Sequence, residues 1–169
     1  MPVIGVAIEI PEPYGTQLRQ RRASYGDVRA ATVPAHITLI PPTEVDDAQF
    51  EKLEENLAQV AQQHSSFDIT LRGTGTFRPV SPVVFVSVVE GISPTEQLAA
   101  DARALVDELS QQFPYHPHVT VAQEVSEGAL DQAFNELSDF QCRWRVEDFC
   151  MYTQNGSPEW RKHRQFNLA

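Results

Sequence analysis

The sequence predicts an α+β fold of two similar lobes related by a pseudo-twofold axis. Apolar segments with the alternation of strands are separated by segments with the period of helices. This order begins again at Val83, and Val83 lies 35 positions before His118, much as Val3 lies 33 positions before His36. We therefore infer an internal duplication of a strand-helix-strand-helix-strand unit, whose two copies pack around a shared cleft.

The first unit is expected to cover about residues 3–77. Its acidic run, residues 44–55, is most simply the solvated start of its second helix. The predicted elements, in order, are the strand Val3–Ile10, the helix Pro13–Tyr25, the strand Val33–Ile40, the helix Asp46–Gln63 and the strand Phe67–Phe77.

The second unit is expected to cover about residues 83–168. Its first helix has a start signal in Ser93-Pro94-Thr95-Glu96, where a capping hydroxyl precedes proline and an acid lies near the positive helix end. Leu98, Ala102, Leu105, Val106 and Leu109 follow at helical spacing and are predicted to be core. The elements are the strand Val83–Glu90, the helix Pro94–Gln112, the strand Pro117–Ala122, the helix Glu127–Leu137, and extended segments Phe140–Tyr152 and Arg161–Leu168.

A glycine-containing stretch, residues 73–82, links the two units. It lacks the lysine of a nucleotide-binding loop, so a bend or a sheet edge is the better account of its glycines. Residues 140–145 echo residues 67–72, which supports the duplication. We expect residues 1–169 to form a single domain with interleaved lobes.

Composition limits the possible functions. Of 169 residues, 41% are hydrophobic, enough for a core, and the net charge of −10 disfavours an extended nucleic-acid surface. One small phosphorylated ligand or one RNA terminus remains possible. No run approaches the length of a membrane span and no leader peptide is apparent, so we expect a soluble, cytoplasmic monomer. Cys142 and Cys150 are expected to be reduced structural thiols.

Basic residues gather in two places despite the acidic balance. Solvated surface is the favoured interpretation of both clusters, and whether either faces the cleft is left open. They comprise Arg19, Arg21, Arg22 and Arg29, and the run Trp160-Arg161-Lys162-His163-Arg164.

The pattern His-x-Thr occurs twice, at His36–Thr38 and His118–Thr120, each time inside an apolar run. Because side chains alternate along a strand, each histidine shares a face with its threonine, while Ile37 and Val119 point to the opposite face. Only about 0.3 such matches are expected by chance. A lone strand histidine is usually structural, but a matched pair favours a functional interpretation.

Two histidines across one cleft can divide proton transfer, since a neutral imidazole removes a proton and a protonated one donates to the leaving oxygen. Threonine hydroxyls can donate to non-bridging phosphate oxygens. The pattern therefore suits displacement at phosphorus. Metal catalysis is the rival use of histidines, but no Asp or Glu accompanies either motif at ligand spacing. We expect no metal and no other cofactor.

These paired motifs, in a duplicated α+β chain of this length, resemble the two-histidine phosphoesterase superfamily, in its bacterial 2'-5' RNA ligase-like and 2',3'-cyclic phosphodiesterase branch. The resemblance covers essentially the whole chain. It implies two antiparallel sheets around a central cleft with helices outside, and metal-independent opening of a 2',3'-cyclic phosphate to a 2'-phosphomonoester. It implies acid-base roles for His36 and His118 and phosphate contacts for Thr38 and Thr120.

Three questions stay open at this stage. The partner is expected to be a cyclic-phosphate nucleotide or an RNA terminus, but a 2'-5' RNA ligase and a non-catalytic nucleotide-binding or RNA-end-binding protein are alternatives. Phe77 and Tyr115 are candidates to stack a base of the substrate, although packing is the favoured interpretation of both. Pseudo-symmetry leaves the base and the acid unassigned between the two histidines.

Overall fold

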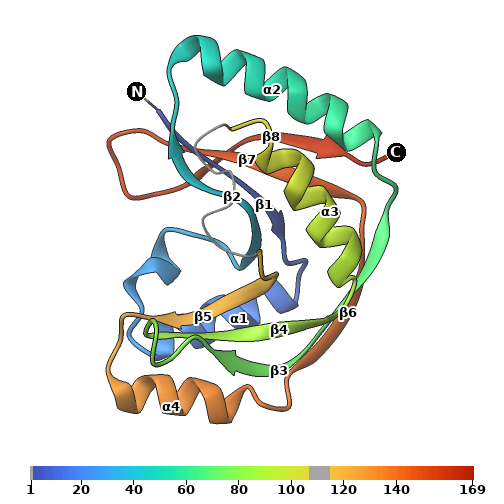
Figure 1. Cartoon of the computed structure of the whole chain (residues 1–169). Coiled ribbons are helices and arrows are strands. Elements are labelled where there is room, and N and C mark those ends of the chain that lie inside the picture. The colour runs from blue at the N-terminus through green and yellow to red at the C-terminus, as the bar shows by residue number, and fades with distance from the viewer. Residues whose placement is uncertain (1, 107–114) are drawn as a thin grey trace.

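Two four-stranded sheets form the framework of the computed structural model, which describes residues 2–106 and 115–169 (Figure 1). The strand orders are β2-β1-β7-β8 and β5-β4-β3-β6, and every pairing is antiparallel. This confirms the predicted α+β class with two antiparallel sheets. The strands are β1 Val3–Glu9, β2 His36–Glu44, β3 Phe67–Thr76, β4 Val83–Glu90, β5 His118–Gln123, β6 Gln141–Val146, β7 Asp148–Gln154 and β8 Arg161–Asn167.

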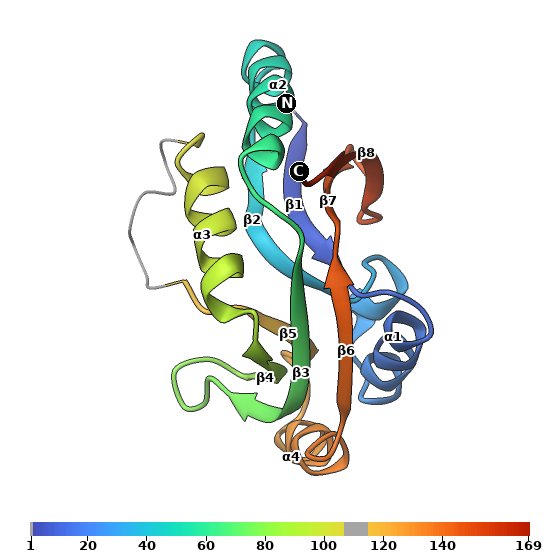
Figure 2. The same cartoon turned by 90° about the vertical axis from the view of Figure 1, so that its right-hand side faces the viewer.

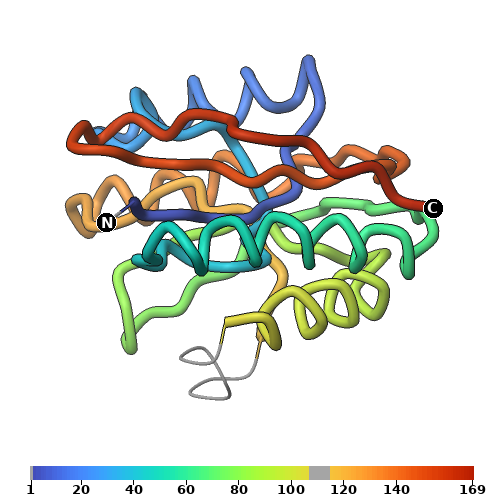
Figure 3. The backbone as a smooth tube through the Cα atoms, turned by 90° about the horizontal axis from the view of Figure 1, so that it is seen from above, coloured from blue at the N-terminus to red at the C-terminus, as the bar shows by residue number. Residues whose placement is uncertain are grey.

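The helices lie on the outside of the sheets, as predicted (Figure 2). Helix α1 packs against β5 and helix α3 against β2, so each of these helices covers a strand from the other half of the chain. Helices α2 and α3 run side by side when the molecule is seen from above (Figure 3). The bounds are α1 Tyr14–Ser24, a 3-10 helix Val28–Ala31, α2 Asp47–Gln62, α3 Ile92–Arg103 and α4 Glu127–Glu136.

The two halves of the chain are interleaved between the sheets. Strand β3 belongs to the first half but pairs with β4 and β6, whereas β7 of the second half pairs with β1. The prediction of one extended segment over Phe140–Tyr152 is therefore wrong in one respect. The segment divides at Glu147, because β6 pairs in one sheet and β7 in the other. Segments 67–72 and 141–146 are hydrogen-bonded neighbours of one sheet. The boundaries of the duplication stay a prediction.

Strand β2 begins and ends later than predicted, at His36 and Glu44 instead of Val33 and Ile40. It continues through Pro41 and Pro42, which have no N–H to donate. Proline is tolerated there because β2 is the outer strand of its sheet. Strand β5 likewise begins at His118, one residue after the predicted Pro117. Both motif histidines are thus the first residues of their strands.

Helix α3 starts two residues before the predicted start at Pro94, and its cap is not the Ser93 hydroxyl. Gly91 is the N-cap residue with φ of 88°, a left-handed conformation that glycine adopts without steric cost. The helix ends at Arg103 rather than Gln112. Residues 104–106 form a turn instead of a helix, and the rest of the predicted helix, with Leu109, lies outside the described residues.

The apolar partners of both motifs are core residues, as the strand alternation predicts. Ile37, Leu39, Val119 and Val121 each have an exposed fraction of 0%. Their burial fixes which face of each strand turns outward, so the histidine and threonine of each motif must share the opposite face. Cys142 and Cys150 are free and buried, in agreement with the expectation. None of the helices in the described part of the chain is long and apolar enough to cross a bilayer.

Candidate active site

The two motif strands are both edge strands, and they meet. Strand β2 is the first strand of one sheet and β5 the first strand of the other, and the two contact each other across the centre of the molecule. His36 opens β2 opposite Glu9 of β1, and His118 opens β5 opposite Ser87 of β4. The fold therefore brings two histidines 82 positions apart to equivalent places on facing edges.

Each imidazole is oriented by the same local hydrogen bond. His36 Nδ1 donates to the carbonyl oxygen of Pro34 at 2.7 Å, and His118 Nδ1 donates to that of His116 at 2.6 Å. A carbonyl oxygen can only accept, so the proton is on Nδ1 in both rings and Nε2 is the remaining nitrogen. In the neutral ring Nε2 can accept a proton, and in the charged ring it can donate one.

Burial lowers the pKa of both imidazoles, because a charged ring loses hydration there. The carbonyl bonds oppose this shift at both sites. At His36 the positive charges of Arg22 and of protonated His118 lower the pKa further, whereas Glu9 raises it. The influence of His118 on His36 means that protonation of one ring disfavours protonation of the other.

His36, Thr38 and Thr120 line one cavity of about 510 Å³. This unites the two predicted threonines from different sheets. His118 does not line this cavity itself. Its ring packs between two aromatic side chains, with its centroid 5.1 Å from that of Phe77 and 5.3 Å from that of Phe85.

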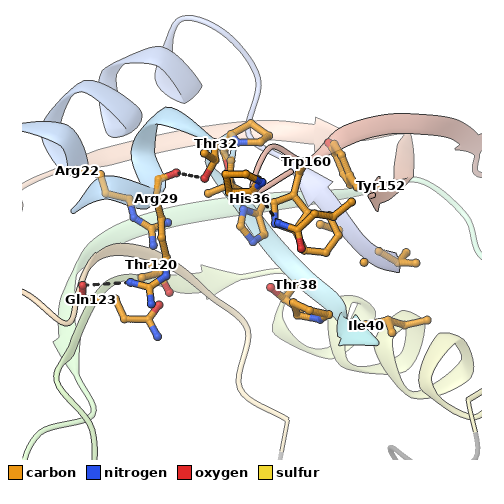
Figure 4. A pocket seen from close by; sticks show the side chains of 18 residues that line it. Arg22, Arg29, Thr32, His36, Thr38, Ile40, Thr120, Gln123, Tyr152 and Trp160 are labelled. Atoms are coloured by element: carbon orange, nitrogen blue, oxygen red, sulfur yellow. Dashed lines mark hydrogen bonds between the residues drawn. The ribbon is translucent and has the colours of Figure 1, made fainter. Parts of the chain in front are cut away.

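Two arginines line the same cavity (Figure 4). Arg22 is only 6% exposed, so the expectation that its cluster is solvated surface is wrong for this residue. Helix α1 packs against β5, and this packing carries Arg22 to the site. None of the described residues that line the cavity is Asp or Glu. A chain of net charge −10 thus contains a cavity lined by positive charge.

Asp27 fixes the positions of the groups around Arg22 by accepting three hydrogen bonds. Its side chain is fully buried and accepts hydrogen bonds from Arg22 Nε at 2.8 Å, from the Arg29 backbone N–H at 3.0 Å and from the Gln123 backbone N–H at 3.0 Å. The last bond reaches the end of β5. One carboxylate therefore sets the position of Arg22 relative to the strand that carries His118.

The two predicted base-stacking residues make internal contacts. Tyr115 donates its hydroxyl proton to the carbonyl oxygen of Thr38 at 2.6 Å, and the guanidinium of Arg103 lies 5.7 Å from its ring centroid. Phe77 lies edge-on to His118. Tyr115 ties the segment before β5 to β2, and Phe77 supports an imidazole. Their contact with a substrate stays a prediction.

Two aromatic residues at the site were not predicted as site residues. Trp160 and Tyr152 line the end of the cavity beyond His36, and Trp160 packs on Tyr152 (Figure 4). The Tyr152 hydroxyl is buried and has no hydrogen-bond partner among the described residues. The sequence signal was Trp160 at the start of the second basic run. The basic residues of that run do not line the cavity: Lys162 pairs with Glu9, and Arg164 pairs with Glu54.

Within residues 2–106 and 115–169, no three His, Cys, Asp or Glu side chains gather in a way that could hold a metal ion. The chemistry that the described site offers lies in its own groups. It has two imidazoles with a free Nε2, two hydroxyls and a buried guanidinium, a set suited to acid-base catalysis on an anion.

Comparison with known sequences gives one family and several relatives. The family model described as "2'-5' RNA ligase superfamily" matches residues 10–158. A protein of Oceanobacillus iheyensis named "Putative phosphoesterase OB1230" is 25% identical over 167 residues, covering 98% of this chain and 97% of that protein. A relative from Bacillus cytotoxicus with the same description is 26% identical over 145 residues, which are 85% of this chain and 84% of that protein.

Solved structures share the fold. The crystal structure of E. coli LigT complexed with 3'-AMP superposes with a TM-score of 0.73 at 20% identity, covering 99% of each chain. Others of LigT are complexed with ATP and with phosphate. The protein TT0787 of Thermus thermophilus superposes with a TM-score of 0.68 at 23% identity, covering 98% of this chain and 97% of that one. At these identities the likeness establishes the arrangement of strands and helices.

Proposed function

The chain belongs to the 2'-5' RNA ligase superfamily, and on that premise we propose that it opens 2',3'-cyclic phosphates of nucleotides or RNA ends to 2'-phosphomonoesters. The observation that carries this proposal is the matched geometry of His36 and His118. Each ring is held through Nδ1 by a carbonyl two residues upstream, so that each presents Nε2 for proton transfer.

In the proposed reaction, water attacks the phosphorus and gives a proton to Nε2 of the neutral imidazole. The protonated imidazole gives its Nε2 proton to the 3'-oxygen as the bond between phosphorus and that oxygen breaks. The products are a 2'-phosphomonoester and a free 3'-hydroxyl. Each ring ends in the protonation state that the other had at the start, and exchange with solvent restores the first arrangement.

Thr38, Thr120 and Arg22 are proposed to hold the phosphate. The threonines can donate hydrogen bonds to its non-bridging oxygens, where negative charge increases in the transition state. Arg22 adds a fixed positive charge in a buried setting, where an interaction with an anion is stronger than in water. Because Asp27 already orients the guanidinium, little reorganisation is needed when substrate binds.

The size of the cavity supports a substrate with one nucleotide in the site. About 510 Å³ lies within the usual range of small-molecule pockets. The nucleotide and phosphate complexes of E. coli LigT, which shares the fold, support a ligand of this class. The cytoplasmic location and monomeric state stay predictions.

The direct test is hydrolysis of 2',3'-cyclic AMP by the purified protein in EDTA. We expect adenosine 2'-monophosphate as the product, identified by chromatography against the 3'-isomer. Absence of turnover would overturn the proposal. Tight binding without product would point instead to a nucleotide-binding protein, and formation of 2'-5' linkages between RNA ends would point to a ligase.

The pH dependence of kcat/KM is expected to be bell-shaped, with its maximum below pH 6.5. One imidazole must be neutral and the other protonated, and burial lowers the pKa of both from the usual 6.5. The protonated acid is thus lost as the pH rises through a pKa below 6.5, and the neutral base is lost at still lower pH. Initial rates at low substrate concentration between pH 4 and 8.5 would measure this. A flat profile from pH 5 to 8 would contradict the shared role of the histidines.

A further inference from the structure

The cavity has two chemically different ends, and only one of them is used by the proposed reaction. His36 and Thr38 lie between these ends (Figure 4). One end has Arg22, Arg29 and Thr120. At the other end Figure 4 labels Ile40, Tyr152 and Trp160, and none of these side chains is charged.

Trp160 forms a wall of the apolar end, with its indole ring beside Gly5 of β1. A Cβ added to Gly5 would lie 3.5 Å from Cζ3 and 3.7 Å from Cη2 of the indole, which is ordinary van der Waals contact. The same ring packs on the small cluster of Ala7, Cys150 and Tyr152. The indole therefore lies against the sheet, beside His36.

The loop that carries Trp160 is held before any ligand binds. The Trp160 backbone N–H donates to the carbonyl oxygen of Thr32 at 3.1 Å, which fastens the loop between β7 and β8 to the segment before β2. Within the loop, Gln154 Nε2 donates to the carbonyl oxygen of Pro158 at 2.8 Å. A preorganised aromatic ring loses little conformational entropy on binding.

Tyr152 adds an aromatic side chain to the same end. Its hydroxyl is enclosed by the protein and has no hydrogen-bond partner in the part of the chain that the structure describes. Burial, with the negative charge of Glu9, raises the pKa of Tyr152, so the phenol stays protonated. A ligand for this end is therefore expected to present a flat apolar face to Trp160 and Tyr152.

We propose that the Trp160 end of the cavity binds the nucleobase of the substrate by stacking, while the arginine end holds the phosphate. This inference rests on the proposed function for the placement of the phosphate. Nucleobases are the flat rings with polar edges that a nucleotide offers beside its phosphate, and stacking on an aromatic side chain tolerates any base. The subsite therefore selects nucleotides over other cyclic phosphodiesters and discriminates weakly among bases.

The test compares two substrates with the same reacting group, 2',3'-cyclic AMP and the 2,3-cyclic phosphate of methyl riboside, which has no base. Trp160→Leu is expected to lower kcat/KM for cyclic AMP by about 5- to 150-fold, the range seen when a base-stacking aromatic is removed. The rate for the riboside should not change. Trp160→Phe should restore most of the loss, since it keeps a stacking face. Trp144→Phe is the matched control, because Trp144 lies on β6 outside this cavity.

Equal losses on both substrates, or no loss on either, would overturn the subsite while the proposed function stands. Binding gives a readout that needs no turnover. The chain has two tryptophans, so Trp160 is the only one left in Trp144→Phe. Adenosine 2'-monophosphate in EDTA should quench its fluorescence saturably, and inorganic phosphate should not. Quenching without any hydrolysis would overturn the proposed function and support the subsite, and absence of quenching would overturn the subsite.

Discussion

Replacing either His36 or His118 with alanine is expected to lower kcat/KM for a 2',3'-cyclic nucleotide by about 10²- to 10⁴-fold, the usual contribution of general acid-base catalysis. The expectation is the same for both residues because their settings match. Each opens an edge strand, each donates through Nδ1 to a carbonyl two residues upstream, and burial lowers the pKa of each.

The variant with both His36 and His118 replaced by alanine tests whether the two histidines act together. If one imidazole removes a proton while the other donates one in the same step, loss of the second ring should cost much less than loss of the first, since the two act as a unit. His163→Gln is the matched control, because His163 pairs with Glu54 on the surface. Initial rates in EDTA measure all four variants. Either single variant retaining more than about half of the wild-type rate would remove that histidine from the mechanism.

The motifs could be predicted from the sequence because their signal is local. Ile37 and Val119 are buried hydrophobic residues in short strands, and the alternation of a strand then fixes the face of each neighbouring histidine. The pairing of the two motifs also followed from sequence, since equivalent positions in a duplicated unit come together at the axis. Helix ends and strand limits were less predictable, as Gly91 and Pro41 show, because they depend on caps and on which strands are edges.

Arg22 and Trp160 could not be assigned to the site from sequence for a different reason. Arg22 lies on a mostly polar helix, in a cluster of arginines of the kind usually exposed to solvent, and it reaches the cavity because α1 packs against a strand from the other half of the chain. Trp160 begins a basic run, and its place in the cavity depends on the backbone hydrogen bond to Thr32 and on packing against Tyr152. Both depend on contacts between segments far apart in the sequence.

Net charge proved to be a poor guide to the site itself. The total of −10 argues against binding along a nucleic acid backbone, and the site is consistent with this, since it concentrates two arginines in one cavity. Asp27 lies behind Arg22, so the guanidinium is paired on its inner side. The acidic surface and the cationic cavity together favour a small anion over a long one.

Asp27→Asn is expected to destabilise the protein by about 3–5 kcal/mol, the cost of breaking a buried ion pair by removing one partner. The side chains of Asp27 and Arg22 are 0% and 7% exposed, so the charge of Arg22 would remain in the interior without its counterion. Asparagine keeps the shape, but both oxygens of Asp27 accept hydrogen bonds, so the change removes one acceptor as well as the charge. Urea unfolding measures the loss of free energy. Glu124→Gln is the matched control: Glu124 pairs with Arg29 at the surface, where a pair contributes about 0–1 kcal/mol.

The double variant Arg22→Met with Asp27→Asn separates the structural role of this pair from its proposed role with the substrate. Removing both charges leaves no buried charge without a partner, so stability should recover well above that of Asp27→Asn alone. Activity should stay low, because the cation that is proposed to hold the phosphate has gone. A double variant no more stable than the single one would show that the two charges are not coupled. A stable double variant with full activity would exclude Arg22 from phosphate binding and leave Thr38 and Thr120 to hold the anion alone.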